Sequence, residues 1–185
     1  MDTDVQLAGR REALGRWLTA RLPACERVSI ARIGRTGGLS HEILDVDARW
    51  EDAGRVIERG LIVRLDPVAY RKRQRSNLRR EFDAQSVLYT RGDVPVPEPL
   101  WFEDDTEVLG AAFYVMERVA GQAATDQPPY QSSGWLAELP GHDRAQIWRS
   151  AVTIMARIHG VPAGAMAALG QAGSAEDDFQ AHVAN

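Results

Sequence analysis

The sequence predicts an α+β fold built around an antiparallel sheet. Three strand-like segments follow one another with short loops between them. Short loops favour an antiparallel meander, because parallel strands need long crossover connections. One helical segment precedes these strands and another follows them, and two more strands come before a mainly helical remainder. This order of elements is typical of the α+β class.

An amphipathic helix opens the chain. Residues Asp4–Leu22 carry apolar side chains at helical spacing, and Pro23 ends the helix. Trp50–Arg55 is predicted to be a turn, because it combines acidic residues with a glycine. Period-two patterns and one dense apolar piece predict three strands, at Val28–Ile33, Ile43–Val46 and Val56–Leu65.

A second helix and a strand pair follow. Apolar residues at helical spacing predict a helix through Glu81–Tyr89, with Ser76 or Asn77 as its cap. The alternating prolines of Asp93–Pro99 predict an extended connector. Two strands are then predicted around the turn Asp104–Glu107, at Leu100–Glu103 and Ala112–Glu117.

The pattern changes near residue 118. The stretch 122–141 reads as a loop with room for a short helix, and Asp143–His159 has the apolar spacing of a helix. We therefore expect a first lobe at residues 1–118 and a hinge with a second, helical lobe at residues 119–185. The first lobe holds the helix 4–22 and then the sheet and helix of residues 26–118.

Composition narrows the functional classes. The 185 residues contain one cysteine, Cys25, which excludes an internal disulfide and a cysteine-based zinc site. The N-terminus lacks the apolar core of a signal peptide, and we expect a cytoplasmic protein with no membrane partner. Residues 1–92 carry 18 basic and 13 acidic side chains (+5), and residues 93–185 carry 4 and 13 (−9). We therefore expect a bound anion to be met by the first half.

Three features stand in a fixed order along the first lobe. The glycine pair Gly37–Gly38 joins the first two strands, Arg64 ends the third, and Glu81 lies in the next helix. Adjacent glycines can form a hairpin turn, or they can let main-chain N–H groups approach phosphates closely. Neither a Rossmann nor a Walker motif is present in the sequence.

This order resembles the N-terminal lobe of the protein-kinase-like fold, and most closely the aminoglycoside phosphotransferase family. The similar pieces are "TGGLSHEILDVD", "LIVRLDP", "LRREFDAQSVLY", "DVPVPEPLWFEDDTEVLGAAFYVMERVAGQ" and "MARIHGVP". They span residues 28–125 and 143–162. The resemblance implies a five-stranded antiparallel sheet with helices, followed by an incomplete, mainly helical C-terminal lobe.

The resemblance also implies a nucleotide site for ATP, with GTP as an alternative. Arg64 would replace the strand lysine that contacts the phosphates, and Glu81 would be its ion-pair partner. Met116 would lie at the back of the base pocket. The remaining contacts would come from the main chain of the glycine loop (Gly37, Gly38, Leu39 and Ser40) and of a second connector, Glu117–Gly121 after the last strand (Glu117 and Val119).

The catalytic part of the family pattern is missing from the sequence. Family members take an acceptor-positioning carboxylate and Mg²⁺ ligands from an H-G-D-x-x-x-x-N loop and a later Asp, and no such loop occurs here. We therefore expect no catalytic or metal-binding residue in this chain, which reads as a truncated family member, inactive alone. An intact relative would bind Mg²⁺ and transfer the γ-phosphate to a small-molecule hydroxyl.

Blander interpretations stay open for each residue. The glycine pair is also read as a plain hairpin turn, Arg64 as a solvated strand end, and Glu81 as a surface carboxylate. At the level of the whole chain, a non-catalytic nucleotide-binding or regulatory remnant is one alternative. A basic-patch interaction module is another, because six of the ten residues in Arg71–Arg80 are positive. That run contains no aromatic residue for stacking, so nucleic acid is not an expected partner.

Overall fold

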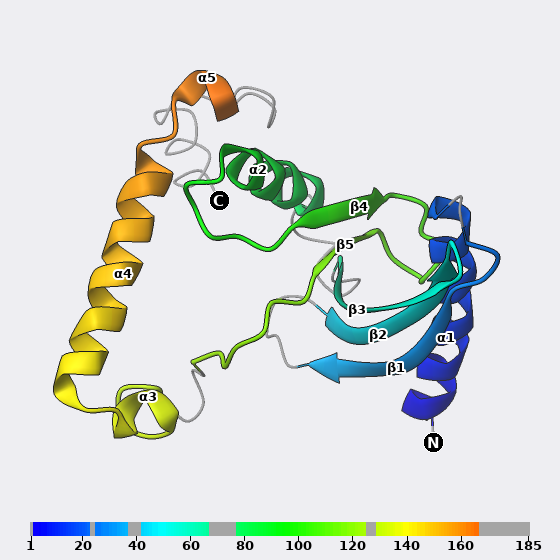
Figure 1. Cartoon of the computed structure of the whole chain (residues 1–185), viewed down its shortest axis with the longest axis horizontal. Helices are drawn as coiled ribbons and strands as arrows, with labels where there is room; N and C mark the ends of the chain where they lie inside the picture. The colour runs from blue at the N-terminus through cyan, green and yellow to red at the C-terminus, as the bar shows by residue number, and fades with distance from the viewer. Residues whose placement is uncertain (1, 23–24, 37–41, 67–76, 125–128, 167–185) are drawn as a thin grey trace, which may run out of the picture. The chain divides into compact units, whose positions relative to one another are not determined.

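The structure is a computed structural model, and it describes residues 2–22, 25–36, 42–66, 77–124 and 129–166. Helices and strands appear in the predicted order (Figure 1). The elements are α1 (Asp2–Arg21), β1 (Ser29–Thr36), β2 (Glu42–Asp52), β3 (Arg55–Leu65), α2 (Leu78–Arg91), β4 (Pro99–Glu103), β5 (Phe113–Glu117), α3 (Trp135–Glu138), α4 (Gly141–His159) and α5 (Ala163–Met166).

The five strands form one antiparallel sheet in the order β1-β2-β3-β5-β4. The predicted α+β fold and its meander of three strands are confirmed. The last two strands enter in reverse spatial order, so that β5 pairs with β3 and leaves β4 at the edge. This exchange places the connector that follows β5 beside the central strand.

The hairpin between β2 and β3 is longer and tighter than the sequence predicted. Asp52 pairs with Arg55, so only Ala53 and Gly54 form the turn. Both residues have positive φ, at 49° and 75°, as a two-residue type I′ hairpin requires. Trp50 and its neighbours, expected in a turn, belong to the strand, because they pair with the other half of the hairpin.

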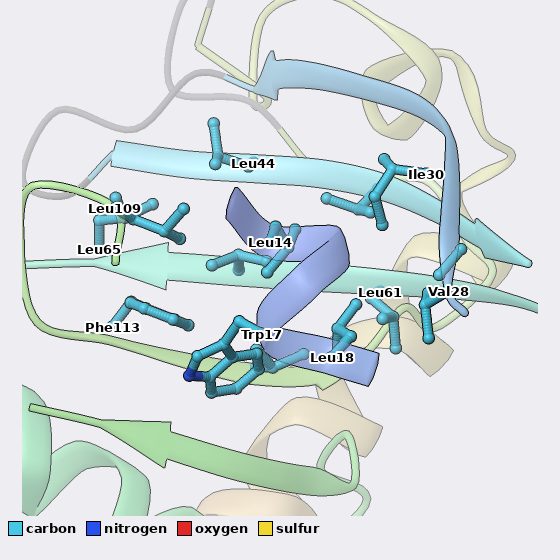
Figure 2. Close-up of a cluster of buried hydrophobic side chains, with 14 of the residues drawn as sticks. Leu14, Trp17, Leu18, Val28, Ile30, Leu44, Leu61, Leu65, Leu109 and Phe113 are labelled. Carbon is cyan, nitrogen blue, oxygen red and sulfur yellow. The ribbon is translucent and has the colours of Figure 1, made fainter. Parts of the chain in front are cut away.

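The main hydrophobic core lies between α1 and one face of the sheet (Figure 2). Leu14, Trp17 and Leu18 of α1 are buried, which confirms the apolar stripe predicted for this helix. The Trp17 and Phe113 rings lie with their centroids 4.9 Å apart. The strands contribute alternate residues to this face: Leu44, Val46, Leu61, Val63, Leu65, Phe113 and Val115.

A polar contact fixes the end of α1 to strand β4. The Trp17 indole N–H donates to a Glu103 carboxylate oxygen over 2.6 Å, and Arg21 pairs with the same carboxylate. The Arg21 guanidinium carbon lies 3.7 Å from the Trp17 ring centroid. The indole hydrogen bond, above all, holds the pKa of Glu103 below its ordinary value, and the Asp105 N–H and the Arg21 charge add to this effect.

Replacing Glu103 with alanine is expected to destabilise the fold by about 1–3 kcal/mol, because the buried Trp17 N–H loses its acceptor. The pKa of Glu103 is lower in the folded chain than in the unfolded chain. Its contribution is therefore complete above the ordinary glutamate pKa and is lost as pH falls through the folded value. Urea unfolding of Glu103→Ala and wild type at pH 7 and near pH 3 measures this. A difference that is equal at both pH values would contradict it.

The chain separates into two compact units, Met1–Ser86 with Pro97–Val119, and Val87–Val96 with Ala120–Asn185. In the second unit, α4 begins two residues before the predicted Asp143 and ends at the predicted His159. None of its side chains is buried, and Trp148 contacts the Tyr130 ring at 6.0 Å between centroids. The predicted apolar stripe therefore exists but faces solvent in the part of the chain that the structure describes.

Among the described residues, no helix has both the length and the apolar character needed to cross a membrane.

Candidate functional site

The sheet has a second face, opposite α1, which we call the open face. Side chains alternate along a strand, so the residues that alternate with the core positions Leu61, Val63 and Leu65 face the other way. On β3 these are Gly60, Ile62 and Arg64. The predicted arginine thus lies on the face that is not filled by the α1 core.

Helix α2 packs on this face. The Asn77 carbonyl accepts the first helical hydrogen bond from the Glu81 N–H at 2.9 Å, so of the two predicted caps Asn77 holds the N-cap position. The Phe82 ring lies 5.7 Å from the rings of both Phe102 and Tyr114. These aromatic contacts set the rotation of α2 and turn Glu81, one residue earlier, toward β3.

Arg64 and Glu81 form the predicted ion pair. The Arg64 Nη2 atom lies 3.0 Å from Glu81 Oε2, and the two side chains are 28% and 33% exposed. The pairing expected from the sequence is confirmed. A guanidinium held in this way keeps a fixed position and charge on the open face.

Tyr114 lies directly across the strand pair from Arg64. It is 2% exposed, and burial raises the pKa of its phenol; the Arg64 charge opposes this shift and the Glu81 carboxylate adds to it. The phenol is therefore neutral at physiological pH. The Tyr114 ring forms a wall beside the ion pair, and its phenol interacts with the Arg64 side chain. From the sequence, Tyr114 was predicted only as part of a strand.

The predicted base-binding residues lie at the end of β5. Met116 pairs with Ile62 on the neighbouring strand β3, and the Gln85 amide nitrogen lies 3.4 Å from the Met116 sulfur. The Glu117 N–H donates to the Glu98 carbonyl over 2.9 Å. Val119 is 63% exposed, and its N–H donates to no acceptor within the described part of the chain.

The predicted phosphate loop, Gly37, Gly38, Leu39 and Ser40, lies outside the described residues. Its flanking strands are described, and Thr36 pairs with Ile43 where they meet the loop. Ile43 in turn pairs with Arg64. The structure thus brings together Arg64, Glu81 and the β5 residues, and it pairs Thr36, the last residue of β1, with Ile43, the β2 partner of Arg64.

Comparison with known proteins decides the family. A sequence model of the phosphotransferase enzyme family matches residues 45–183. The chain belongs to this family. The family resemblance read from the sequence is thereby confirmed.

One solved structure has the same fold as this chain. It is a crystal structure from Ralstonia eutropha JMP134, named a putative aminoglycoside phosphotransferase. The identity is 25% and the TM-score is 0.56, over 88% of this chain and 42% of the other.

Curated relatives match over shorter stretches. Human acyl-CoA dehydrogenase family member 11 is 35% identical over 80 residues, which is 43% of this chain and 9% of that protein. The Gallus gallus protein of the same name is 45% identical over 47 residues, 25% of this chain. The chain therefore spans about a tenth of the length of the curated relatives it matches. The word dehydrogenase in their name refers to those proteins and not to this chain.

Sequence reasoning missed a group of charged residues on the open face. Arg118 lies within the predicted connector, and its side chain pairs with Asp45 and Asp47 of β2. Two signals were available. Asp45 and Asp47 alternate with core residues in a strand, and Gly60 interrupts β3, which often marks a close approach of another group.

Proposed function

We propose that the first unit of this chain binds a nucleoside triphosphate, ATP or GTP, on the open face of the sheet. The chain would be the nucleotide-binding lobe of a small-molecule kinase that transfers the γ-phosphate to a hydroxyl group. The observation that carries the proposal is the ion pair of Arg64 and Glu81 on the open face, in a member of the phosphotransferase enzyme family.

Each proposed contact follows from the chemistry of the residue. Arg64 offers a planar guanidinium that can donate two parallel hydrogen bonds to a phosphate, and Glu81 holds it in place. Gly37 and Gly38 would let main-chain N–H groups of the loop, with Leu39 and Ser40, approach the phosphates. The Glu117 carbonyl and the Val119 N–H would bind the base beside Met116. The nucleotide supplies the transferable phosphoryl group.

The expected Mg²⁺ finds no ready site in the described residues. They contain no group of three or more His, Cys, Asp or Glu side chains that could hold a metal ion. The sequence also lacks the H-G-D-x-x-x-x-N loop. We therefore propose that this chain binds a nucleotide but does not transfer phosphate by itself. We also propose that it binds the nucleotide in the cytoplasm.

Replacing Gly38 with valine is expected to weaken ATP binding about tenfold, because a branched side chain in the loop keeps the main chain away from the phosphates. Gly9→Val is the matched control. Gly9 lies on α1, and a Cβ there would meet no atom within 4 Å, so this variant should bind like wild type. Calorimetric titration of wild type and both variants with ATP and GTP measures the effect.

Two results would contradict the proposal. No heat of binding for either nucleotide in the wild type would exclude the nucleotide site. Equal affinities of wild type and Gly38→Val would move the site away from the loop. Separately, Mg²⁺-dependent transfer of labelled phosphate to any hydroxyl compound would contradict the proposed inactivity of the isolated chain.

A further inference from the structure

Four charged side chains form a second ionic group on the open face, which we call the Arg118 cluster. Its members are Arg32 of β1, Asp45 and Asp47 of β2, and Arg118 after β5. The Arg118 Nη1 atom lies 2.7 Å from Asp45 and 2.6 Å from Asp47. Arg32 lies 3.0 Å and 2.7 Å from the same two carboxylates. Two positive and two negative charges therefore balance within the cluster.

The backbone of Gly60 makes room for Arg118. A Cβ at residue 60 would lie 2.5 Å from both Nε and Nη2 of the Arg118 guanidinium, closer than real Cβ contacts allow. The Arg118 N–H also donates to the Gly60 carbonyl over 3.0 Å. Arg118 is thus fixed to the same strand residue by its main chain and covers it with its side chain.

Arg118 stands between the two residues proposed to contact the base. Glu117 precedes it and Val119 follows it, so fixing Arg118 limits the positions of the Glu117 carbonyl and the Val119 N–H. Gly60 and Arg64 share the open face and lie four residues apart on β3, which is about 13 Å of strand. The cluster therefore marks the base end of the proposed site, and Arg64 marks the phosphate end.

We infer that Arg118 is a positioning residue for base selection: held by Asp45 and Asp47 above Gly60, it fixes the main-chain groups that read the nucleotide base. The inference rests on the proposed nucleotide site and adds its base selectivity.

A purely stabilising role explains the cluster less well. The side chains of Arg118, Asp45 and Asp47 are 34%, 21% and 37% exposed. Partly exposed ion pairs contribute little to folding, because water screens the charges and the long side chains lose entropy. Hydrogen bonds from Arg32 and then Arg118 hold the pKa of Asp47 below its ordinary value, so Asp47 stays ionised near neutral pH.

The test measures the affinities of ATP, GTP and CTP, which share their phosphates and differ in the base. Arg118→Met should bind the preferred nucleotide about tenfold more weakly, a change of about 1.4 kcal/mol. It should lose less affinity for the other two, so that the ratios approach one. Arg118→Lys keeps the charge and should recover part of the preference. Gly60→Ala should act like Arg118→Met, because it displaces the guanidinium.

Arg49→Met is the matched control. Arg49 pairs across the β2–β3 hairpin with Glu58 at 3.7 Å, away from the connector, and should bind all three nucleotides like wild type. Thermal unfolding of each variant shows whether it is folded; if Gly60→Ala does not fold, the two Arg118 variants decide.

Three outcomes would overturn the inference. The first is an Arg118→Met variant with unchanged ratios, and the second is a uniform loss for all three nucleotides. The third is a wild type that binds nucleotides without preference. A wild type that binds no nucleotide at all would instead refute the proposed function, and this result is distinct from the other three.

Discussion

Replacing Phe113 with alanine is expected to lower the free energy of unfolding by about 3–5 kcal/mol. Phe113 is completely buried, and its ring packs against Trp17 of α1. The strand pairs on both sides hold its backbone in place, with Leu65 opposite on β3 and Glu103 opposite on β4. The backbone therefore cannot move in to fill the cavity that the missing ring leaves. The variant loses both the free energy of burying the ring and its van der Waals contacts. Typical domains are stable by only about 5–15 kcal/mol, so this loss would bring the chain close to unfolding.

Tyr89→Ala is the matched control, because it also removes an aromatic ring but from a side chain that is 44% exposed on α2. Its effect should stay within about 1 kcal/mol of wild type, as for most surface substitutions. Urea unfolding followed by circular dichroism measures both variants. A Phe113→Ala variant as stable as Tyr89→Ala would contradict the packing of α1 against the sheet at Phe113.

Most of the fold could be predicted from the sequence, because apolar residues recur at the spacing of the buried face of each helix or strand. Strand β3 shows this most clearly: Leu61, Val63 and Leu65 are buried, and Arg64 between them points to the open face. Because successive side chains of a strand point to opposite faces, a charged residue between buried apolar positions lies on the face opposite the core. The ion pair with Glu81 was expected from the family resemblance, because periodicity places Arg64 on the open face but does not identify its partner.

The spatial order of the strands was not predictable from local patterns. Strand β4 precedes β5 in the chain, yet β5 takes the central position beside β3. The buried pattern of Phe113, Tyr114 and Val115 agrees with a strand covered on both faces, whereas all of β4 is only partly buried. This contrast reflects tertiary packing and not propensity.

The Arg118 cluster shows a second limit of sequence reasoning. Its four members lie on three different elements, and the closest in sequence, Asp45 and Asp47, have the same charge. Ion pairs between distant segments leave no periodic signal. The alternation of Asp45 and Asp47 with core residues places two charges on the open face, and the isolated Gly60 indicates that another group approaches there, but neither signal identifies Arg118 as that group.

The apolar stripe of α4 shows the opposite case, because the pattern predicts a helix but not its surroundings. The helix forms as predicted, while Trp148, Val152 and Met155 are each about half exposed. Periodicity thus determines which side chains share a face, and contacts with other segments determine whether that face is buried.

Replacing Arg64 with alanine is expected to weaken nucleotide binding about 10- to 150-fold, the range for the loss of one hydrogen bond to a charged group. Hydrogen bonds between charged partners contribute about 1.5–3 kcal/mol each, and every 1.4 kcal/mol corresponds to a factor of ten in affinity. Arg64 is held for this contact by Glu81 at 3.0 Å and flanked by the buried Tyr114. Arg64→Lys should recover only part of the affinity, because an ammonium group cannot donate two parallel hydrogen bonds to one phosphate.

The loss should be equal for ATP, GTP and CTP, since Arg64 contacts a group that all three share. This separates it from the Arg118 variants, whose effect depends on the base. Arg79→Ala is the control: Arg79 is an exposed arginine of α2, paired with Asp83 at 3.0 Å, and its removal should leave all three affinities unchanged. Calorimetric titration of the three variants measures the difference. If Arg64→Ala and Arg79→Ala bound nucleotides equally well, the phosphate end of the site would lie elsewhere, and the Arg64–Glu81 pair would only join α2 to the sheet.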